Sequence, residues 1–481
     1  MLLPSVFLLL LPLSFAAFTP PPQTFINTLI ARTIELGGAT TQVTTQYNVK
    51  SSVDGPGNYY LTLAGDRDEE PAWWEVTVGG KAVEGVEIVP PTVSVPVGEL
   101  KKGESVTLSL TYLFTHASTP LPTSIEQRDP QYLLWKTNST YVDSWYASDV
   151  QRIKIRSPSP TILSYSSVPT TYTRDSTVTK SSSTLTLGPF HSIPATLGET
   201  AIEQKPFSVH YETREPVIGL RSLKRSAEVS HWGANLNIQD DIALVNIGPM
   251  LKGHFSRLAH QQSKFHASTP AQILTEFTLR VPPTAHSAYF YDTIGNVSTS
   301  HFRQGSTPAS SARSSKVRTS PRTVDGVLEL KPRYPVLGGW SYSFVVGYDM
   351  PLEDALKVES DGRKVLAVPF FTGMKDLVVD EVELRIVLPE GAKDVEVIPP
   401  FAVDTLQHSV HKTYLDSTGR HTITLRKTRC TENHAQPVYI LYTYPLSAQL
   451  QKPLTVAAVV GGLFVLAMGL RRVDYGIEKT Q

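Results

Sequence analysis

The segment SVTLSLTYLF, residues 105–114, decides the fold of this 481-residue chain. Apolar residues alternate in it with Ser and Thr, which is the period-two pattern of a strand with one buried face. The apolar members are Val106, Leu108, Leu110, Tyr112 and Phe114. The pattern recurs at 277–281, 340–346 and 382–388, and Thr and Val dominate 40–49. With 36 Pro and 30 Gly as turn signals, this predicts a mainly β protein of antiparallel β-sandwich-like domains and not a βαβ fold.

Two β-rich domains account for most of the length. A charged run at 221–225 follows the last strand-like stretch of the first half, so we expect domains at 17–223 and 224–445. One short helix is expected within 240–259. The pentapeptide HASTP occurs at 116–120 and 266–270. Its flanks do not align, so we interpret it as a coincidence and not as a sign of duplicated domains.

Residues 300–323 differ in amino-acid composition from the rest of the second domain. The segment is rich in Ser and Thr, and it has five basic residues and no acid. Such a composition cannot build a core, so we expect a flexible basic surface loop. The alternative is an electrostatic contact with lipid phosphates or an acidic partner.

Both ends of the chain carry membrane signals. Residues 2–15 are almost wholly apolar, and Ser14 and Ala16 are small residues suited to cleavage, so 1–16 is predicted to be a signal peptide cut after Ala16. Residues 454–470, LTVAAVVGGLFVLAMGL, are uncharged and would cover about 25 Å as a transmembrane helix. Arg471 and Arg472 follow at once, which places the tail 471–481 in the cytosol by the positive-inside rule. The order predicts a single-pass type I protein whose bulk is luminal.

Charge and cysteine content exclude several classes of protein. Lys and Arg number 44, as do Asp and Glu, so no whole-chain field draws the protein to nucleic acid. Cys430 is the single cysteine and cannot form an intrachain disulfide. In an oxidising compartment this disfavours the disulfide-bonded ectodomains of receptors. A buried, inert thiol is one interpretation of Cys430, and an intermolecular bridge or a redox site is the other.

The search for catalytic chemistry finds no motif. The sequence contains no zinc H-E-x-x-H, no nucleophile elbow, no P-loop and no dinucleotide fingerprint. We therefore assign no catalytic, cofactor-binding or metal-binding residue and expect no cofactor. Two sequons, at Asn138 and Asn296, are candidate glycosylation sites in a luminal domain. Gly295 precedes the second, which favours an exposed turn.

Several unusual blocks resemble the ribophorin I family, the alpha subunit of the endoplasmic reticulum oligosaccharyltransferase. The blocks in the second half are LKGHFSR (251–257), YDTIGNVSTS (291–300), PRYPVLGGW (332–340) and GY (347–348). Those in the first half are Leu121, Pro122, Ile125, Gln127, QYLLW (131–135), Gln151 and Arg152. The basic loop is longer than the family leads us to expect, and the tail is shorter than in animal members.

The resemblance implies a function. The family's complex transfers a preassembled glycan from dolichyl diphosphate to Asn in N-x-Ser/Thr sequons, and its active site belongs to another, multi-spanning subunit. A non-catalytic subunit of the endoplasmic reticulum membrane is therefore implied, one that supports the complex and presents or retains protein substrates. Its implied partners are the other subunits, nascent polypeptides, membrane lipid and the translocon.

Two other classes stay open at this stage. A single-pass adhesion or receptor-like protein would also combine sandwich domains with one span. A membrane-anchored hydrolase would require a triad or a metal cluster, and the sequence shows neither.

Overall fold

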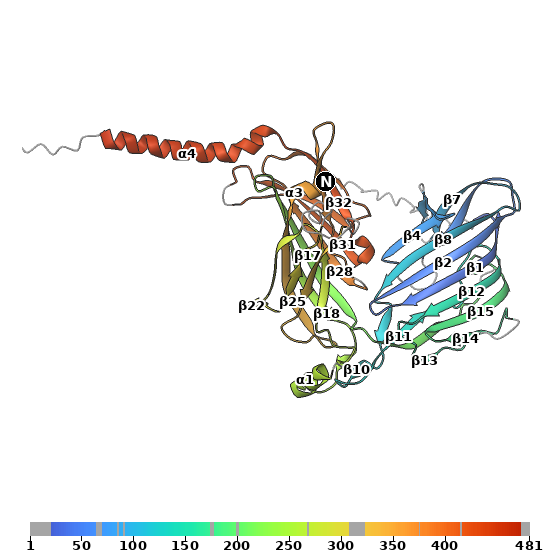
Figure 1. The fold of residues 1–481 in the computed structure, drawn as a ribbon. Helices are drawn as coiled ribbons and strands as arrows, with labels where there is room; N and C mark the ends of the chain where they lie inside the picture. Colours follow the sequence, from blue (N-terminus) through green and yellow to red (C-terminus); the bar gives the residue numbers. More distant parts are fainter. Residues whose placement is uncertain are drawn as a thin grey trace, which may run out of the picture.

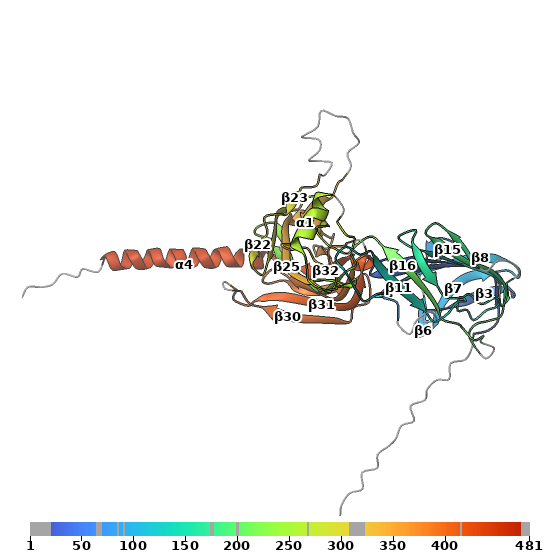
Figure 2. The same ribbon diagram turned by 90° about the horizontal axis from the view of Figure 1, so that it is seen from below.

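The structure is a computed structural model that describes residues 21–472, apart from 64–69, 84–85, 90–91, 174–177, 199–201, 267–268, 307–322, 375 and 414–415. Two β domains lie side by side, and helix α4 (Leu446–Arg472) extends from the second domain, away from the first (Figure 1, Figure 2). The signal peptide with its Ala16 cleavage site and residues 473–481 lie outside the described residues.

The first domain packs a large sheet against two smaller ones. The large sheet has the order β14 (Val178–Ser181), β15 (Thr184–Ile193), β12 (Ser148–Arg156), β1 (Phe25–Leu36), β2 (Thr40–Ser51), β8 (Ser105–Thr115), β4 (Trp73–Val78), β5 (Lys81–Ala82). The smaller sheets are β3 (Gly55–Thr62), β7 (Thr92–Leu100), β6 (Glu87–Val89), and β13 (Ile162–Tyr165), β16 (Phe207–Thr213), β11 (Gln131–Thr137), β9 (Ser118–Pro120). One core cluster draws residues from all three sheets.

The second domain has the same arrangement and a core of its own. Its large sheet has the order β22 (Gly295–Asn296), β21 (His286–Asp292), β25 (Ser341–Pro351), β18 (Asn235–Asn246), β17 (Ile218–Ser230), β28 (Val378–Val387), β31 (Arg420–Thr431), β30 (Thr405–His411). The smaller sheets are β20 (Phe277–Val281), β24 (Gly326–Leu330), β23 (His301–Arg303), and β26 (Leu356–Val358), β27 (Lys364–Pro369), β32 (Pro437–Thr443), β29 (Lys393–Ile398). Short elements complete the domain: β19 (Met250–Leu251), α1 (Arg257–Phe265), α3 (Leu352–Ala355) and the 3-10 turn η1 (Glu432–His434).

The two domains repeat one topology strand for strand. The first strand of each, β1 or β17, pairs antiparallel with the next strand and parallel with a strand from the later half, β12 or β28. The remaining strands of the large sheets, and those of the three- and four-stranded sheets, follow in matching order. The chain therefore contains two domains of one topology, which the repeated pentapeptide did not reveal. The two HASTP segments are unrelated to it, because one follows β8 and the other follows α1, and β8 corresponds to β25.

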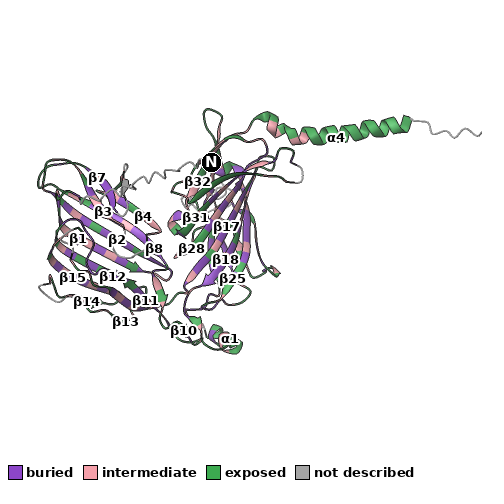
Figure 3. Cartoon of the chain, turned by 180° about the vertical axis from the view of Figure 1, so that it is seen from behind, coloured by how far each residue is buried: buried purple, intermediate pink, exposed green. Residues whose placement is uncertain are grey.

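The sandwich expectation is confirmed, with one parallel pairing in each large sheet. The predicted strands correspond to β2, β8, β20, β25 and β28. Buried and exposed residues alternate along these strands (Figure 3), as the hydrophobic pattern requires.

Two boundaries differ from expectation. The division at 223/224 falls inside β17, and the domains are joined by residues 214–217. Within the charged run, Arg221 and Lys224 face the solvent, whereas Leu223 and Arg225 face inward. The helix expected within 240–259 is wrong, because β18 occupies 235–246 and α1 begins only at Arg257.

The basic loop is shorter than expected. Residues His301–Arg303 form β23, which pairs with β24, and Ser306 bridges to Val324. The remaining stretch, 307–322, lies outside the described residues. Helix α4 contains the whole of the predicted 454–470 segment and begins eight residues before it. It is the one helix in the described part of the chain that is long and apolar enough to cross a membrane.

A buried ion pair lies in the core of the second domain. Arg225 on β17 is the cross-strand partner of Asp240 on β18, and both side chains are inaccessible to solvent. The Nε and Nη2 atoms of Arg225 each donate to a carboxylate oxygen of Asp240 at 2.6 Å. Nη1 donates to the carbonyl of Pro369 at 3.0 Å, and Thr372 accepts from Nη2. The carboxylate thus compensates the buried charge, and β17 and β18 are tied to the loop after β27.

Candidate functional site: the domain seam and the base of the membrane helix

The two domains share a small parallel sheet at their seam. Strand β10 (Ser124–Ile125) of the first domain pairs with β19 of the second. Next to it, the Nε2 atom of Gln127 donates to the carbonyl of Ser256 at 3.1 Å, and the Ser256 amide donates back to Oε1 at 2.8 Å. The buried Gln272 donates to the carbonyls of Glu126 and Gln127. Backbone pairing and side-chain amides therefore join the two domains at this point.

An aromatic contact joins the two domains at another part of the seam. Trp73 on β4 meets Phe401 and His434 edge-on, with ring centroids 6.4 and 5.0 Å apart. Burial, and then the Lys427 charge, lower the pKa of His434 to about 4, so the imidazole is neutral at physiological pH. Arg429 Nη1 donates to the carbonyl of Glu70 at 3.1 Å. The contact is thus apolar at its centre and polar at its margin.

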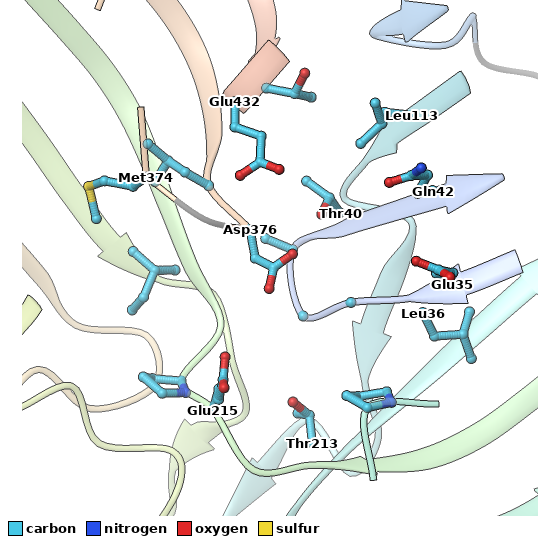
Figure 4. A pocket seen from close by; sticks show the side chains of 18 of the residues that line it. Glu35, Leu36, Thr40, Gln42, Leu113, Thr213, Glu215, Met374, Asp376 and Glu432 are labelled. Atoms are coloured by element: carbon cyan, nitrogen blue, oxygen red, sulfur yellow. The ribbon is translucent and has the colours of Figure 1, made fainter. Parts of the chain in front are cut away.

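A cleft of about 470 Å³ opens between the domains (Figure 4). Four acidic residues line it: Glu35, Glu215, Asp376 and Glu432. Arg214 is also in the lining, and its guanidinium lies 3.5 Å from Glu212. Glu35 is itself paired with Arg156 at 2.8 Å, so the acidic charge of the lining is partly compensated. Across the described ranges, no three or more His, Cys, Asp and Glu side chains are grouped to hold a metal ion.

Three of the second-half sequence blocks on which the family resemblance rests contact one another. Phe255, just before α1, meets Trp340 with ring centroids 5.8 Å apart, and Trp340 meets Tyr334 at 6.2 Å. Arg333 forms a two-pronged ion pair with Asp292, at 2.7 and 2.9 Å. These second-half blocks lie up to about ninety residues apart along the chain and meet through the fold, whereas the first-half blocks include residues of β11 and β12 in the first domain.

The second sequon lies on a tight hairpin that Asp292 organises. Its carboxylate accepts from the amides of Ile294 and Gly295 at 2.9 and 3.1 Å. Bonding to Arg333 holds the pKa of Asp292 well below its usual range, against the opposing effect of burial. Gly295 has φ +139°, a conformation that L side chains rarely adopt. Asn296 is exposed on β22, so a glycan could be attached there without disturbing the core.

The first sequon is also accessible. Asn138 is exposed just after β11, whereas Ser139 and Thr140 are buried. The hydroxyl of Thr140 donates to the carbonyl of Lys205 at 2.8 Å. Glycosylation of Asn138 and Asn296 stays a prediction.

The base of α4 is fixed to the second domain by a tryptophan. Pro453 lies inside the helix and has no N–H, so the carbonyl of Gln449, four residues earlier, lacks its usual helical donor. Trp232, in the turn between β17 and β18, donates its indole Nε1–H to this carbonyl at 2.9 Å. The turn therefore satisfies the carbonyl that the proline leaves open.

Charged groups complete the joint between α4 and the body. Lys452 Nζ lies 2.5 Å from Asp416 and 3.6 Å from Glu390, and both carboxylates are buried. Burial would raise the pKa of Glu390, but donors from Thr418 and Ser417 outweigh it and lower the value to about 2. The pKa of Asp416 is also held below its usual range, chiefly by Lys452 and Thr413 acting against burial. Both acids are thus charged at physiological pH and hold the helix to the loop between β30 and β31.

Sequence reasoning missed these groups for identifiable reasons. Trp232 and Lys452 are 220 residues apart, and only the fold brings both to the base of α4. The alternation of β17 and β18 does place Arg225 and Asp240 on the inward face, so that pair could have been found from the pattern. Cys430 is fully buried, and burial raises the pKa of its thiol to about 12, which favours the inert interpretation.

The fold and the joint define a class: a membrane-anchored protein whose two topologically matched β domains form one body on a single C-terminal helix. Within this class, the chain belongs to the ribophorin I family, which it matches over residues 25–471. It is 31% identical over 459 residues to dolichyl-diphosphooligosaccharide–protein glycosyltransferase subunit 1 of Caenorhabditis elegans, covering 93% of this chain and 72% of that relative. Identity to subunit 1B of Arabidopsis thaliana is 30%, over 80% of this chain and 75% of the relative.

Solved structures offer only a distant likeness. Native leukotriene A4 hydrolase of Saccharomyces cerevisiae matches 42% of this chain and 31% of its own, at 12% identity and a TM-score of 0.26. The M1 zinc metallopeptidase of Deinococcus radiodurans gives 13% identity and a TM-score of 0.25, over 43% of this chain and 44% of its own. Likeness at this level supports no conclusion about function.

Proposed function

We propose that this protein is a non-catalytic subunit of an oligosaccharyltransferase complex, which transfers a glycan from dolichyl diphosphate to Asn in N-x-Ser/Thr sequons. Membership of the ribophorin I family carries the proposal, since two relatives over most of the chain are named as subunit 1 of that glycosyltransferase. The joined two-domain body fits a supporting role, because it offers a large surface attached to the base of one apolar helix. Other subunits, including a multi-spanning catalytic one, are the expected partners, together with nascent polypeptide, membrane lipid and the translocon.

Co-purification tests the proposal. The tagged full-length chain, extracted from microsomes in mild detergent, should bring down a fixed set of other chains together with glycosyl transfer to an acceptor peptide. A receptor or adhesion protein would elute without that activity, and this result would contradict the proposal.

The proposed location is the endoplasmic reticulum membrane, with the β domains luminal and the end of α4 cytosolic. Arg471 and Arg472 at the C-terminal end of α4 support this orientation. In sealed microsomes, protease should remove only a C-terminal tag. Digestion of the β domains under those conditions would reverse the orientation.

A further inference from the structure

The two large sheets have four edge strands, and β30 differs from the other three. Strands β14, β5 and β22 end the sheets with four, two and two residues, whereas β30 ends its sheet with seven. In the corresponding place in the first domain, β14 carries Lys180, whose Nζ donates to the carbonyl of Ile162 at 3.2 Å. Short edges and lysines are the means by which proteins prevent strand addition. Strand β30, TLQHSVH, is not short and contains no lysine.

The apolar face of the large sheet continues onto β30, but there its side chains are exposed to solvent. Leu406 and His408 are the register partners of Leu425 and Ile423, which are fully buried. Leu406 itself is 43% exposed, and Val410 on the same face is 68% exposed. Six of the seven side chains of β30 are exposed, and Figure 2 shows the strand at the margin of the domain. No strand among the described residues pairs with its outer edge.

This edge leads to the membrane helix. The loop that follows β30 contains Asp416 and Ser417, which bind Lys452 and Gln451 of α4. Val410 lines a cavity of about 810 Å³ together with Leu454 and Thr455, the first residues of the predicted span. An occupant of the edge would therefore lie beside the bilayer surface.

We propose that β30 binds an extended segment of another polypeptide chain, which adds to the sheet as a ninth strand. Only an extended backbone matches the row of N–H and C=O groups along a strand edge. The absence of charge on residues 405–410 and the exposed Leu406 and Val410 fit a segment with apolar side chains at alternate positions. The partner of the second domain is thus an extended polypeptide segment. The inference rests on the proposed function only in placing that partner within the same complex.

Site-specific crosslinking in native membranes tests the inference. A photoreactive benzoylphenylalanine replaces Gln407 in the full-length chain, and the crosslinked product is identified by mass spectrometry. The same residue at Val358 is the matched control, because Val358 is 66% exposed on the edge strand β26, which already carries Lys357. We expect a crosslink to a different polypeptide from position 407 and none of that product from position 358.

A second variant shows whether the crosslink depends on strand addition. Leu406→Lys with Val410→Lys places two charges on exposed positions and should leave thermal unfolding unchanged. It should reduce the crosslink at least tenfold, whereas Val358→Lys should not. In the membrane, alternate amides of β30 should also exchange more slowly than in the purified chain alone.

The outcomes separate the two proposals. A missing crosslink, a crosslink only to a second copy of this chain, or a crosslink unaffected by the lysines overturns the inference about β30. If these failures occur while the other subunits still co-purify, only that inference falls. If the crosslink forms to a chain outside any glycosyltransferase, the inference about β30 is supported and the proposed function is contradicted.

Discussion

At the scale of single residues, the second domain depends on polar groups inside an apolar framework. The Arg225–Asp240 pair has no access to water, and Asp292 is held by Arg333, by two amides and by the Tyr342 hydroxyl. Removing one partner from such an arrangement leaves an uncompensated buried group, which costs more than removing both.

Asp240→Asn should therefore destabilise the domain strongly, by about 3–5 kcal/mol, because Arg225 would stay charged and buried. Replacing both residues, with Arg225→Met and Asp240→Leu, should recover most of that loss. Chemical denaturation of the protein gives both values. Equal losses from the single and the double variant would show that the ion pair is not the cause.

The hairpin at the second sequon gives a further residue-level prediction. Gly295→Val should cost about 1–3 kcal/mol through backbone strain alone, since no atom lies within 4 Å of the added Cβ. Ile294→Val, at a side chain 76% exposed, is the matched control and should be neutral. Asn296→Gln should remove the mass of one glycan without loss of stability. An unmodified Asn296, together with unchanged melting of Gly295→Val, would contradict the turn and its glycosylation.

At the scale of elements, the positions of strands were far more predictable from the sequence than the contacts between elements. Alternation gave β8, β20, β25 and β28 directly, because one buried face is a local property of the sequence. The helix expected within 240–259 failed because residues 235–246 form strand β18, where Asp240 is the buried partner of Arg225. The attachment of α4 could not be predicted, since Trp232 and Gln449 meet only through the fold.

A double-mutant cycle tests that attachment. Trp232→Phe removes the donor to the Gln449 carbonyl and should lower local stability by about 1 kcal/mol. In a Pro453→Ala background the new helical N–H satisfies the same carbonyl, so Trp232→Phe should cost much less. Hydrogen exchange of the α4 amides at residues 447–451 measures both effects. Equal cost in the two backgrounds would refute the role given to Trp232.

The acids at the base of α4 give a pH dependence. The folded pKa of Glu390, about 2, lies below the ordinary value near 4.3. Its contribution to stability is therefore present above about pH 4 and is lost as pH falls toward 2. The melting temperature of Glu390→Gln should lie below that of the unaltered protein at pH 7, and the difference should shrink below pH 4. Glu396→Gln, at an exposed carboxylate paired with Arg363, is the control and should change little at any pH.

At the scale of the whole molecule, the repeated topology is the feature least visible in the sequence. Both domains follow one strand order, yet the one repeated pentapeptide lies at non-equivalent places. Topology constrains which positions face inward and leaves the choice among apolar residues free, so two domains can share an order of strands without aligned sequence. The resemblance to the ribophorin I family was recognisable because its blocks are long, unusual stretches of continuous sequence.

We propose that this protein supports glycan transfer without performing it. The most direct measurement compares glycosyl transfer by the purified full-length chain with transfer by the complex it co-purifies with, using the same lipid-linked donor and acceptor peptide. We predict turnover by the complex and none by the chain alone. Turnover by the purified chain without other subunits would contradict the account.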